Sequence, residues 1–158
     1  MTQRLALDTF KTIVAFTPLV SIDLVVYNSN NQILLGLRNN RPAKGYWFVP
    51  GGRICKDETF DIAFQRLMIE ELGIAYSIKD ATFIGHYQHL YQDNFSDKDF
   101  TTHYVVLGYM LKQDINIDEL PSEQHKNYKW WDINELLSST KVHENTKAYF
   151  INNRYHSW

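Results

Sequence analysis

The segment from Gly52 to Ile74 constrains the fold of this chain more than any other stretch does. After a glycine turn, apolar residues recur at every third or fourth position, as they do along the buried face of a helix. The residues on this stripe are Phe60, Ala63, Phe64, Leu67 and Met68. The sequence therefore predicts a helix over residues 58–72, with Asp57 as its N-cap and Gly73 as its stop signal.

Glu71 stands out within this helix because it falls in the middle of the apolar stripe. Its carboxylate would lose hydration there, and in the last turn the helix dipole disfavours an anion by about 0.3–1 kcal/mol. A divalent cation, Mg²⁺ or Mn²⁺, would offset both costs and would favour a diphosphate substrate. The alternative is a surface helix with ordinary salt bridges, such as one between Arg66 and Glu70.

The spacing of charged residues in this segment favours the metal-binding alternative. Five residues separate Gly52 from Glu58, seven separate Glu58 from Arg66, and the pair Glu70–Glu71 follows just before the next glycine. This arrangement resembles the Nudix box, the signature of hydrolases that act on nucleoside diphosphates linked to another group.

Leu67 departs from the general family pattern, which has Glu directly after the Arg. Nudix enzymes that cleave between phosphates typically gather several carboxylates around more than one metal and direct water at phosphorus. With an apolar residue here, a single metal can still neutralise the diphosphate, but as a leaving group. Attack would then fall on the carbon attached to the diphosphate.

Patterns elsewhere in the chain predict the remaining elements, including a short helix within residues 1–16. The expected strands are Leu19–Tyr27, Gln32–Arg38, Tyr46–Val49, Ala81–Tyr91, Thr102–Leu111 and Tyr128–Trp131, and the later helices are Ile133–Leu137 and 142–151. This succession indicates an α+β fold, which in the resembled family is a mixed β-sheet sandwiched between α-helices. At 158 residues without a linker-like stretch, the chain is expected to form one domain over residues 1–158.

Composition excludes several classes of function. The net charge of −2 provides no basic surface for nucleic acid, and no apolar run is long enough to cross a membrane. The one cysteine, Cys55, rules out an internal disulfide and suits a reducing compartment, so we expect a cytoplasmic protein.

Further blocks of sequence narrow the resemblance, and they occur in order over about residues 4–150. They are Thr17–Ser21, Arg41–Arg53, Asp93–Ser96, Asp99–Gly108 and Glu123–His125. Together they resemble the GDP-mannose mannosyl hydrolase branch of the Nudix superfamily, which also carries leucine at the position of Leu67. The resemblance implies a homodimer that hydrolyses GDP-mannose, and GDP-glucose, at the anomeric carbon with inversion, releasing GDP and free sugar.

The residues around the glycine turn and before the last strand are candidates for metal binding and proton transfer. The resemblance implies one metal ion per subunit, Mg²⁺ or Mn²⁺, bound by the Gly51 carbonyl, Glu71 and Gln124. His125 would be the general base that activates water, a task that suits the ordinary pKa of imidazole. A lone histidine in a polar turn is otherwise most often a surface residue. Glu70 leaves room for a second, weaker metal.

Arginines and aromatic residues are the candidates for substrate binding. Arg38 and Arg53 suit phosphate oxygens because a guanidinium group forms bidentate, charge-assisted hydrogen bonds. The resemblance implies that these arginines and Tyr104 stabilise charge on the departing diphosphate, and that Asp23 stabilises oxocarbenium character in the sugar. It also implies contacts of His89 with the sugar and of Arg4, Leu5 and Phe10 with the nucleotide, Phe10 as a base-stacking ring in the segment 1–16.

Two alternatives to the glycosyl hydrolase stay open at this point. One is a Nudix diphosphatase that attacks phosphorus and cleaves between the phosphates. The other is a non-catalytic sensor of nucleotide sugars on the same fold. Products separate the two reactions, because carbon attack gives GDP and sugar whereas phosphorus attack gives GMP and sugar 1-phosphate.

Overall fold

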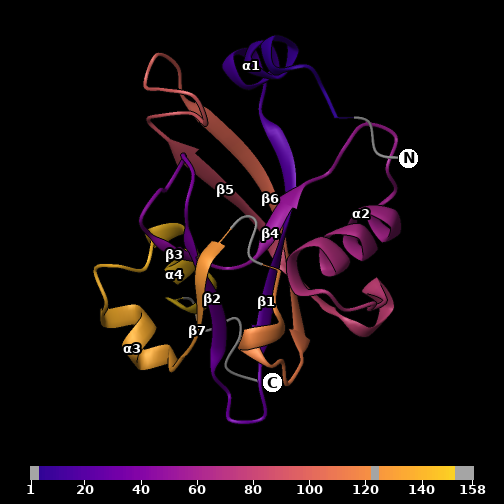
Figure 1. Ribbon diagram of the computed structural model, residues 1–158, viewed down its shortest axis with the longest axis vertical. Helices are drawn as coiled ribbons and strands as arrows, with labels where there is room; N and C mark the ends of the chain where they lie inside the picture. The colour runs from indigo at the N-terminus through magenta and orange to yellow at the C-terminus, as the bar shows by residue number, and fades with distance from the viewer. Residues whose placement is uncertain (1–3, 122–124, 152–158) are drawn as a thin grey trace.

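The protein is built around a mixed β-sheet (Figure 1). The computed structural model describes residues 4–121 and 125–151, with the side chains of residues 125 and 126 left out. Within these residues the sheet has seven strands in the order β3-β2-β1-β6-β5, with β4 paired to β1 and β7 paired to β2. The β1–β6 pair is parallel and the other pairs are antiparallel.

The predicted strands and helices occur in the expected order, and one further strand, β4, lies between the second hairpin and the acidic helix. The strands are β1 (Leu19–Tyr27), β2 (Ile33–Arg38), β3 (Trp47–Phe48), β4 (Gly51–Arg53), β5 (Thr82–Tyr91), β6 (Thr102–Lys112) and β7 (His125–Trp131). The α-helices are α1 (Leu7–Phe16), α2 (Phe60–Leu67), α3 (Ile133–Ser138) and α4 (Glu144–Ile151). A π-helix, Met68–Leu72, directly continues α2, and short 3-10 turns occupy Ile78–Asp80 and Ile117–Glu119.

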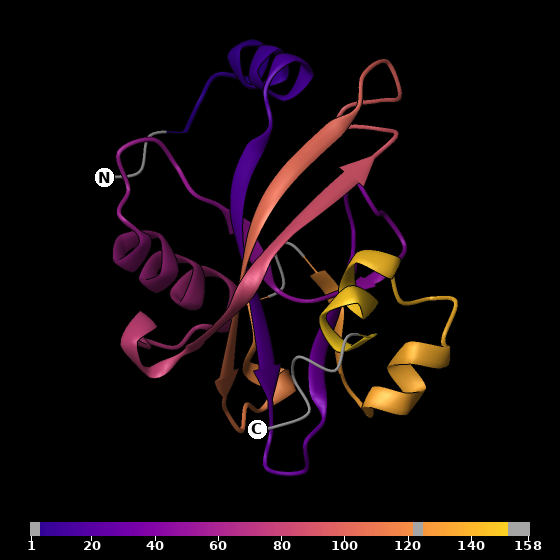
Figure 2. The same cartoon turned by 180° about the vertical axis from the view of Figure 1, so that it is seen from behind.

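Helices cover both faces of the sheet, which confirms the predicted α+β sandwich (Figures 1 and 2). Side chains alternate between the two faces along a strand. In β1, Val25 packs in one core cluster with residues of α3 and α4, such as Leu136 and Phe150. Leu24 packs in the other cluster, against residues of α2 such as Phe64. None of the described helices is long and apolar enough to span a lipid bilayer.

The expected helix over 58–72 forms, but it begins differently from the prediction. Thr59 is the N-cap, and its hydroxyl accepts a hydrogen bond from the Ile62 amide at 3.2 Å. Asp57 was the wrong choice, because its φ of 68° places it in a left-handed turn that ends before the helix starts. Phe60 is 57% exposed, so the buried stripe starts at Ala63. Gly73 ends the helix with a φ of 67°, which favours glycine because a side chain would be strained there.

Two strand predictions were wrong at their ends, because pairing between segments that are distant in the sequence determines where these strands begin and end. The expected strand Tyr46–Val49 is reduced to β3, and a separate strand, β4, pairs with the middle of β1. The expected strand Tyr128–Trp131 begins earlier, at His125, because β7 continues to pair with β2 as far as Arg38. A polar segment can therefore form a β-strand when a neighbouring strand supplies its backbone hydrogen bonds.

Candidate functional site

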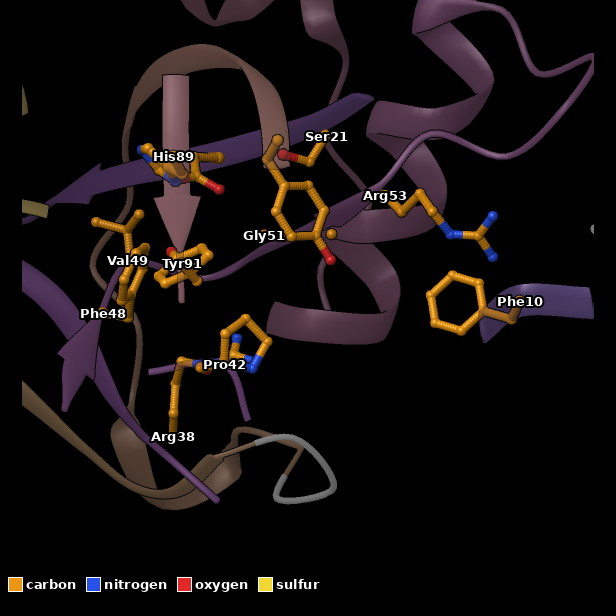
Figure 3. A pocket seen from close by; sticks show the side chains of 13 residues that line it. Phe10, Ser21, Arg38, Pro42, Phe48, Val49, Gly51, Arg53, His89 and Tyr91 are labelled. Atoms are coloured by element: carbon orange, nitrogen blue, oxygen red, sulfur yellow. The ribbon is translucent and has the colours of Figure 1, made fainter. Parts of the chain in front are cut away.

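A pocket of about 220 Å³ (Figure 3) lies on the sheet face that also carries α3 and α4, because its lining residue Asp23 is on the same face of β1 as Val25. Because side chains alternate along strands, Ser21 and Asp23 of β1 share the face that lines the pocket, as do His89 and Tyr91 of β5. The lining residues are Phe10, Ser21, Asp23, Arg38, Pro42, Phe48, Val49, Gly51, Gly52, Arg53, His89, Tyr91 and Tyr104. The pocket brings together seven residues singled out from the sequence, namely Phe10, Asp23, Arg38, Gly51, Arg53, His89 and Tyr104.

Asp23 is a buried carboxyl group in the wall of this pocket. It is 7% exposed, and its Oδ2 accepts a hydrogen bond from the Tyr149 hydroxyl at 2.5 Å. Burial raises the pKa of Asp23 to about 7, although the hydrogen bond from Tyr149 and the charge of Arg38 act in the opposite direction. Gly51 pairs with Asp23 across the strands, and a Cβ on this glycine would lie 2.6 Å from Asp23 Oδ1. The glycine is therefore needed for the close approach of the carboxylate to the turn.

His89 places a polar nitrogen in the same wall. Its side chain is 4% exposed, and among the described residues nothing hydrogen-bonds to its Nε2. Aromatic rings surround it, with the centroid of Phe48 at 5.8 Å and that of Tyr149 at 6.3 Å. Burial, with a smaller contribution from His143, lowers the pKa of His89 to about 4. The imidazole is therefore neutral near pH 7 and can hydrogen-bond to a ligand hydroxyl.

The lowered pKa of His89 predicts a pH-dependent contribution to stability. The unfolded protein takes up a proton on this histidine near pH 6.5, whereas the folded protein does so only near pH 4. The contribution of His89 to the free energy of unfolding is therefore fully present above pH 6.5 and is lost as the pH falls toward 4. Asp23 and Glu71, whose pKa values are raised, act with the opposite sign in an overlapping range.

The effect of His89 is isolated by comparing wild-type protein with His89→Gln in urea unfolding at several pH values. Between about pH 7 and about pH 4.5, the free energy of unfolding of wild type should fall by about 2–3 kcal/mol relative to the variant. Parallel pH dependence of the two proteins would contradict the buried, neutral histidine.

Arg38 and Arg53 approach the pocket from different sides (Figure 3). The Nε of Arg38 donates a hydrogen bond to the Pro42 carbonyl at 2.9 Å, which fixes the direction of its guanidinium group. Arg53 lies over the Phe10 ring, with its Cζ 4.8 Å from the ring centroid. Tyr104 is half-buried in the same pocket, and burial raises the pKa of its hydroxyl. A protonated hydroxyl and two cations in one pocket suit an anionic ligand with several oxygens.

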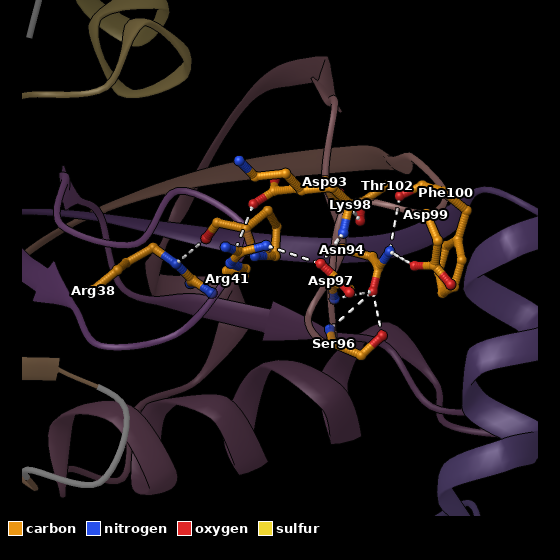
Figure 4. A network of polar contacts seen from close by, with 11 residues as sticks. Arg38, Arg41, Asp93, Asn94, Ser96, Asp97, Lys98, Asp99, Phe100 and Thr102 are labelled. Atoms are coloured by element: carbon orange, nitrogen blue, oxygen red, sulfur yellow. Dashed lines mark hydrogen bonds and ion pairs between the residues drawn. The ribbon is translucent and has the colours of Figure 1, made fainter.

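A loop between β5 and β6 holds Phe95 next to Phe10, with 4.8 Å between the ring centroids. Asn94, fully buried, organises this loop (Figure 4). Its Oδ1 accepts hydrogen bonds from the Ser96 amide at 2.8 Å, the Ser96 hydroxyl at 2.5 Å and the Asp97 amide at 2.9 Å. Its Nδ2 donates to Asp99 and to the Phe100 carbonyl. The block Asp93–Ser96 is thus a structural anchor for the loop beside the N-terminal helix.

Glu71 is buried in the π-helix, as the apolar stripe predicts, and is 2% exposed. Burial raises its pKa to about 8, the charge of Glu70 adds to this, and the charge of Arg38 opposes it. Leu67, one turn earlier, packs against the glycine turn so closely that a Cβ on Gly52 would lie 2.5 Å from its Cδ2. The helix therefore packs directly against the turn that contains Gly51 and Gly52.

A cation fits this arrangement, because a carboxylate and a backbone carbonyl are the hard oxygen donors that Mg²⁺ prefers. Among the described residues, no group of three or more His, Cys, Asp or Glu side chains could hold a metal. With Glu71 and the Gly51 carbonyl as candidate ligands, an ion at this turn would need other oxygen donors to complete its coordination.

Arg66 connects Glu58 and Glu70, the other two acidic residues of the Gly52–Ile74 segment, to the loop before the helix. Its Nε lies 2.6 Å from Glu58 Oε1, and its Nη1 lies 3.0 Å from Glu70 Oε2. Its Nη2 donates to the Arg53 carbonyl at 2.8 Å. Glu58 also accepts a hydrogen bond from the Cys55 amide at 2.8 Å. Glu58 and Arg66 thus orient the helix and the loop, and Glu70 is paired with Arg66, which disfavours the second metal that this residue suggested.

The remaining candidates lie outside the pocket lining or outside the described residues. Arg4 is exposed and Leu5 is half-buried, and neither lines the pocket. Gln124 falls outside the described residues. The backbone of His125 pairs with that of Arg38, so β7 begins beside a pocket residue, while the histidine side chain lies outside the description.

Sequence reasoning missed Tyr91 and Tyr149. Tyr91 lines the pocket, and burial raises its pKa above the ordinary range. The alternation of β5 offered a signal for Tyr91, because it lies two residues after His89 and hence on the same face. Tyr149 offered none, because it is 126 positions from its partner Asp23.

Comparisons with known proteins agree with this geometry. The model of the NUDIX domain matches residues 17–153. The chain is 37% identical over 128 residues to the low-salt glycan biosynthesis protein Agl8 of Haloferax volcanii, covering 81% of this chain and 80% of that protein. It is 30% identical over 128 residues to an ADP-ribose pyrophosphatase of Methanocaldococcus jannaschii, covering 80% and 69% respectively. The crystal structure of a MutT protein from Methanosarcina mazei superposes with a TM-score of 0.65 at 21% identity, covering 84% and 91%. The chain therefore belongs to the Nudix family of hydrolases.

Proposed function

We propose that this protein hydrolyses GDP-mannose, and GDP-glucose, at the anomeric carbon, releasing GDP and free sugar with inversion. The observation that carries the proposal is the loss of carboxylates from the metal site. Leu67 is buried against Gly52 where the general family pattern has Glu, and Glu70 is paired with Arg66. Such a site supports one cation that neutralises a leaving group better than a multi-metal cluster that activates water at phosphorus.

Nudix hydrolases generally use divalent metal ions such as Mg²⁺. In this protein one ion per subunit, Mg²⁺ or Mn²⁺, would be held by the Gly51 carbonyl, Glu71 and Gln124. When bound, it would offset the negative charge of the diphosphate leaving group.

Side chains of the pocket also stabilise the negative charge of the diphosphate leaving group. Arg38 and Arg53 bind phosphate oxygens from two sides, and the Tyr104 hydroxyl donates a hydrogen bond to a third position. Each such donor contributes about 3–4 kcal/mol where charge develops in the transition state. Phe10 lines the pocket, and a nucleobase would stack on its ring in the place that the Arg53 guanidinium group occupies in the free protein.

Asp23 and His89 bind the sugar at the other wall of the pocket. The carboxylate of Asp23 stabilises positive charge on the ring as the bond to the diphosphate breaks. The neutral imidazole of His89 hydrogen-bonds to a sugar hydroxyl. His125 takes the proton from the attacking water, whose oxygen forms the new bond to the anomeric carbon, while the old bonding pair leaves on the diphosphate.

The relatives support a nucleotide-sugar substrate to different degrees. The similarity to a glycan biosynthesis protein agrees with a substrate that carries a sugar. The similarity to an ADP-ribose pyrophosphatase favours the second candidate, a diphosphatase that attacks phosphorus. We further propose that the chain is one domain, acts as a cytoplasmic homodimer, and uses residues 1–16 in nucleotide contacts or dimer formation.

Hydrolysis of GDP-mannose in water enriched with the ¹⁸O isotope tests the proposal directly. We expect the label in mannose and none in GDP, because water attacks carbon. Mass spectrometry of the two products measures the label, and proton NMR of freshly formed mannose reports inversion. Label in a phosphate group, with GMP and mannose 1-phosphate as products, would establish the diphosphatase instead.

A further inference from the structure

Tyr149 does not line the pocket, but it holds a residue that does. Its hydroxyl donates a hydrogen bond of 2.5 Å to Asp23 Oδ2, and its side chain is fully buried. It belongs to α4, and its ring packs against Tyr87 at 4.5 Å and His89 at 6.3 Å between centroids. The position of the hydroxyl is therefore fixed by the core and not by solvent-exposed groups.

The sheet leaves room for this ring next to Asp23. Gly108 of β6 pairs with Asp23 on one side and with Gly85 on the other. A Cβ on Gly108 would lie 3.2 Å from Tyr149 Cε1 and 3.0 Å from Ile84 Cγ1, closer than ordinary van der Waals contact. The space that a side chain would occupy is thus filled by the tyrosine that reaches the carboxylate.

The two oxygens of Asp23 have different surroundings. Oδ2 accepts the hydrogen bond from Tyr149, whereas Oδ1 lies toward the Gly51 turn, where an added Cβ would come within 2.6 Å of it. A carboxylate bound at one oxygen by a rigid donor cannot rotate freely about its last side-chain bond. We propose that Tyr149 is a positioning residue, which holds Asp23 so that Oδ1 is presented to the sugar of the substrate. This inference rests on the proposed function.

Tyr149→Phe tests the proposal because it removes the hydroxyl and keeps the ring. With GDP-mannose, we expect kcat to fall about 10- to 100-fold, as is typical for residues that orient a functional group, and KM to change less than about threefold. In an Asp23→Ala background there is no carboxylate to position, so Tyr149→Phe should lower kcat no further. Tyr87→Phe removes a hydroxyl from the neighbouring ring and should retain wild-type kcat.

Two results would overturn the proposal. One is a Tyr149→Phe protein with wild-type kcat, and the other is an equal loss with and without Asp23, which a purely structural tyrosine would give. If Tyr149→Phe does not fold, Gly108→Ala takes its place, because the added methyl group crowds the Tyr149 ring and Ile84 and keeps the hydroxyl. The same dependence on Asp23 is expected, and a loss independent of Asp23, or no loss, would count against the proposal.

A wild-type protein that fails to hydrolyse GDP-mannose would reject the proposed function and not the coupling between these residues. Urea unfolding then provides the readout. Tyr149→Phe should lower the unfolding midpoint of wild type and leave that of Asp23→Ala unchanged. Equal lowering in both backgrounds would show that the hydroxyl does not act through Asp23.

Discussion

Glu71→Gln is expected to lower kcat for GDP-mannose by at least about 100-fold. Replacing residues that merely orient a metal ligand already costs about 10- to 100-fold, and Glu71 is proposed to be a ligand itself. The amide keeps the shape of the side chain and removes the negative charge that a cation requires. The fold should survive, because burial of this 2% exposed side chain already favours its neutral form, and the amide is neutral and of the same shape. The loss should therefore appear in turnover and in the Mg²⁺ concentration needed for half-maximal rate, and not in thermal stability.

Glu70→Gln is the matched control, since it makes the same chemical change at the neighbouring residue. The Glu70 side chain is 49% exposed and is paired with Arg66 at the surface, so the substitution should cost at most about 1 kcal/mol of stability. Its kcat should stay within about threefold of wild type, because Glu70 is engaged by Arg66 and is not a ligand of the proposed single ion. Steady-state rates over a Mg²⁺ titration measure both variants. Equal losses in the two proteins, or full activity of Glu71→Gln, would contradict a single-carboxylate metal site.

The contrast between these two glutamates was predictable because helical periodicity is a local property. The apolar stripe from Ala63 to Met68 places Glu71 inward, and the structure confirms that it is buried. Arg66 is four residues before Glu70, so their ion pair follows from helix geometry alone. The N-cap was not predictable in the same way. Asp57 and Thr59 are both good capping residues, and the left-handed turn at Asp57 decides between them.

The pocket itself depends on contacts between distant parts of the chain. The resemblance singled out Asp23 and His89 one at a time, but their shared wall exists because β1, β6 and β5 lie side by side. Strand β4 is too short to leave a periodic signal and forms only because β1 offers it hydrogen bonds. Tyr149 reaches Asp23 from the last helix across a gap left by Gly108. Such long-range pairs are fixed by tertiary packing, which a single sequence does not record.

His125→Gln is expected to reduce kcat for GDP-mannose by about 100- to 10,000-fold while KM stays nearly constant, because a general base acts mainly in the transition state. The structure adds a reason to expect this of His125 and not of another histidine. Its backbone pairs with that of Arg38, a pocket residue, at the start of β7. Neither the fold nor the arginine should be disturbed by a glutamine there, because the pairing uses main-chain atoms alone.

His86→Gln serves as the control for this substitution, since His86 is an exposed residue of β5 and does not line the pocket. Its kcat should match that of wild type. Added imidazole should restore part of the activity of His125→Gln, because an external base can then accept the proton of the attacking water. A variant that keeps kcat within a few-fold of wild type, or one whose KM rises as much as its kcat falls, would show that His125 binds substrate or stabilises the strand. The base would then have to be sought among the other groups of the pocket, of which Asp23, with its raised pKa and its place in the wall, is the first to replace by alanine.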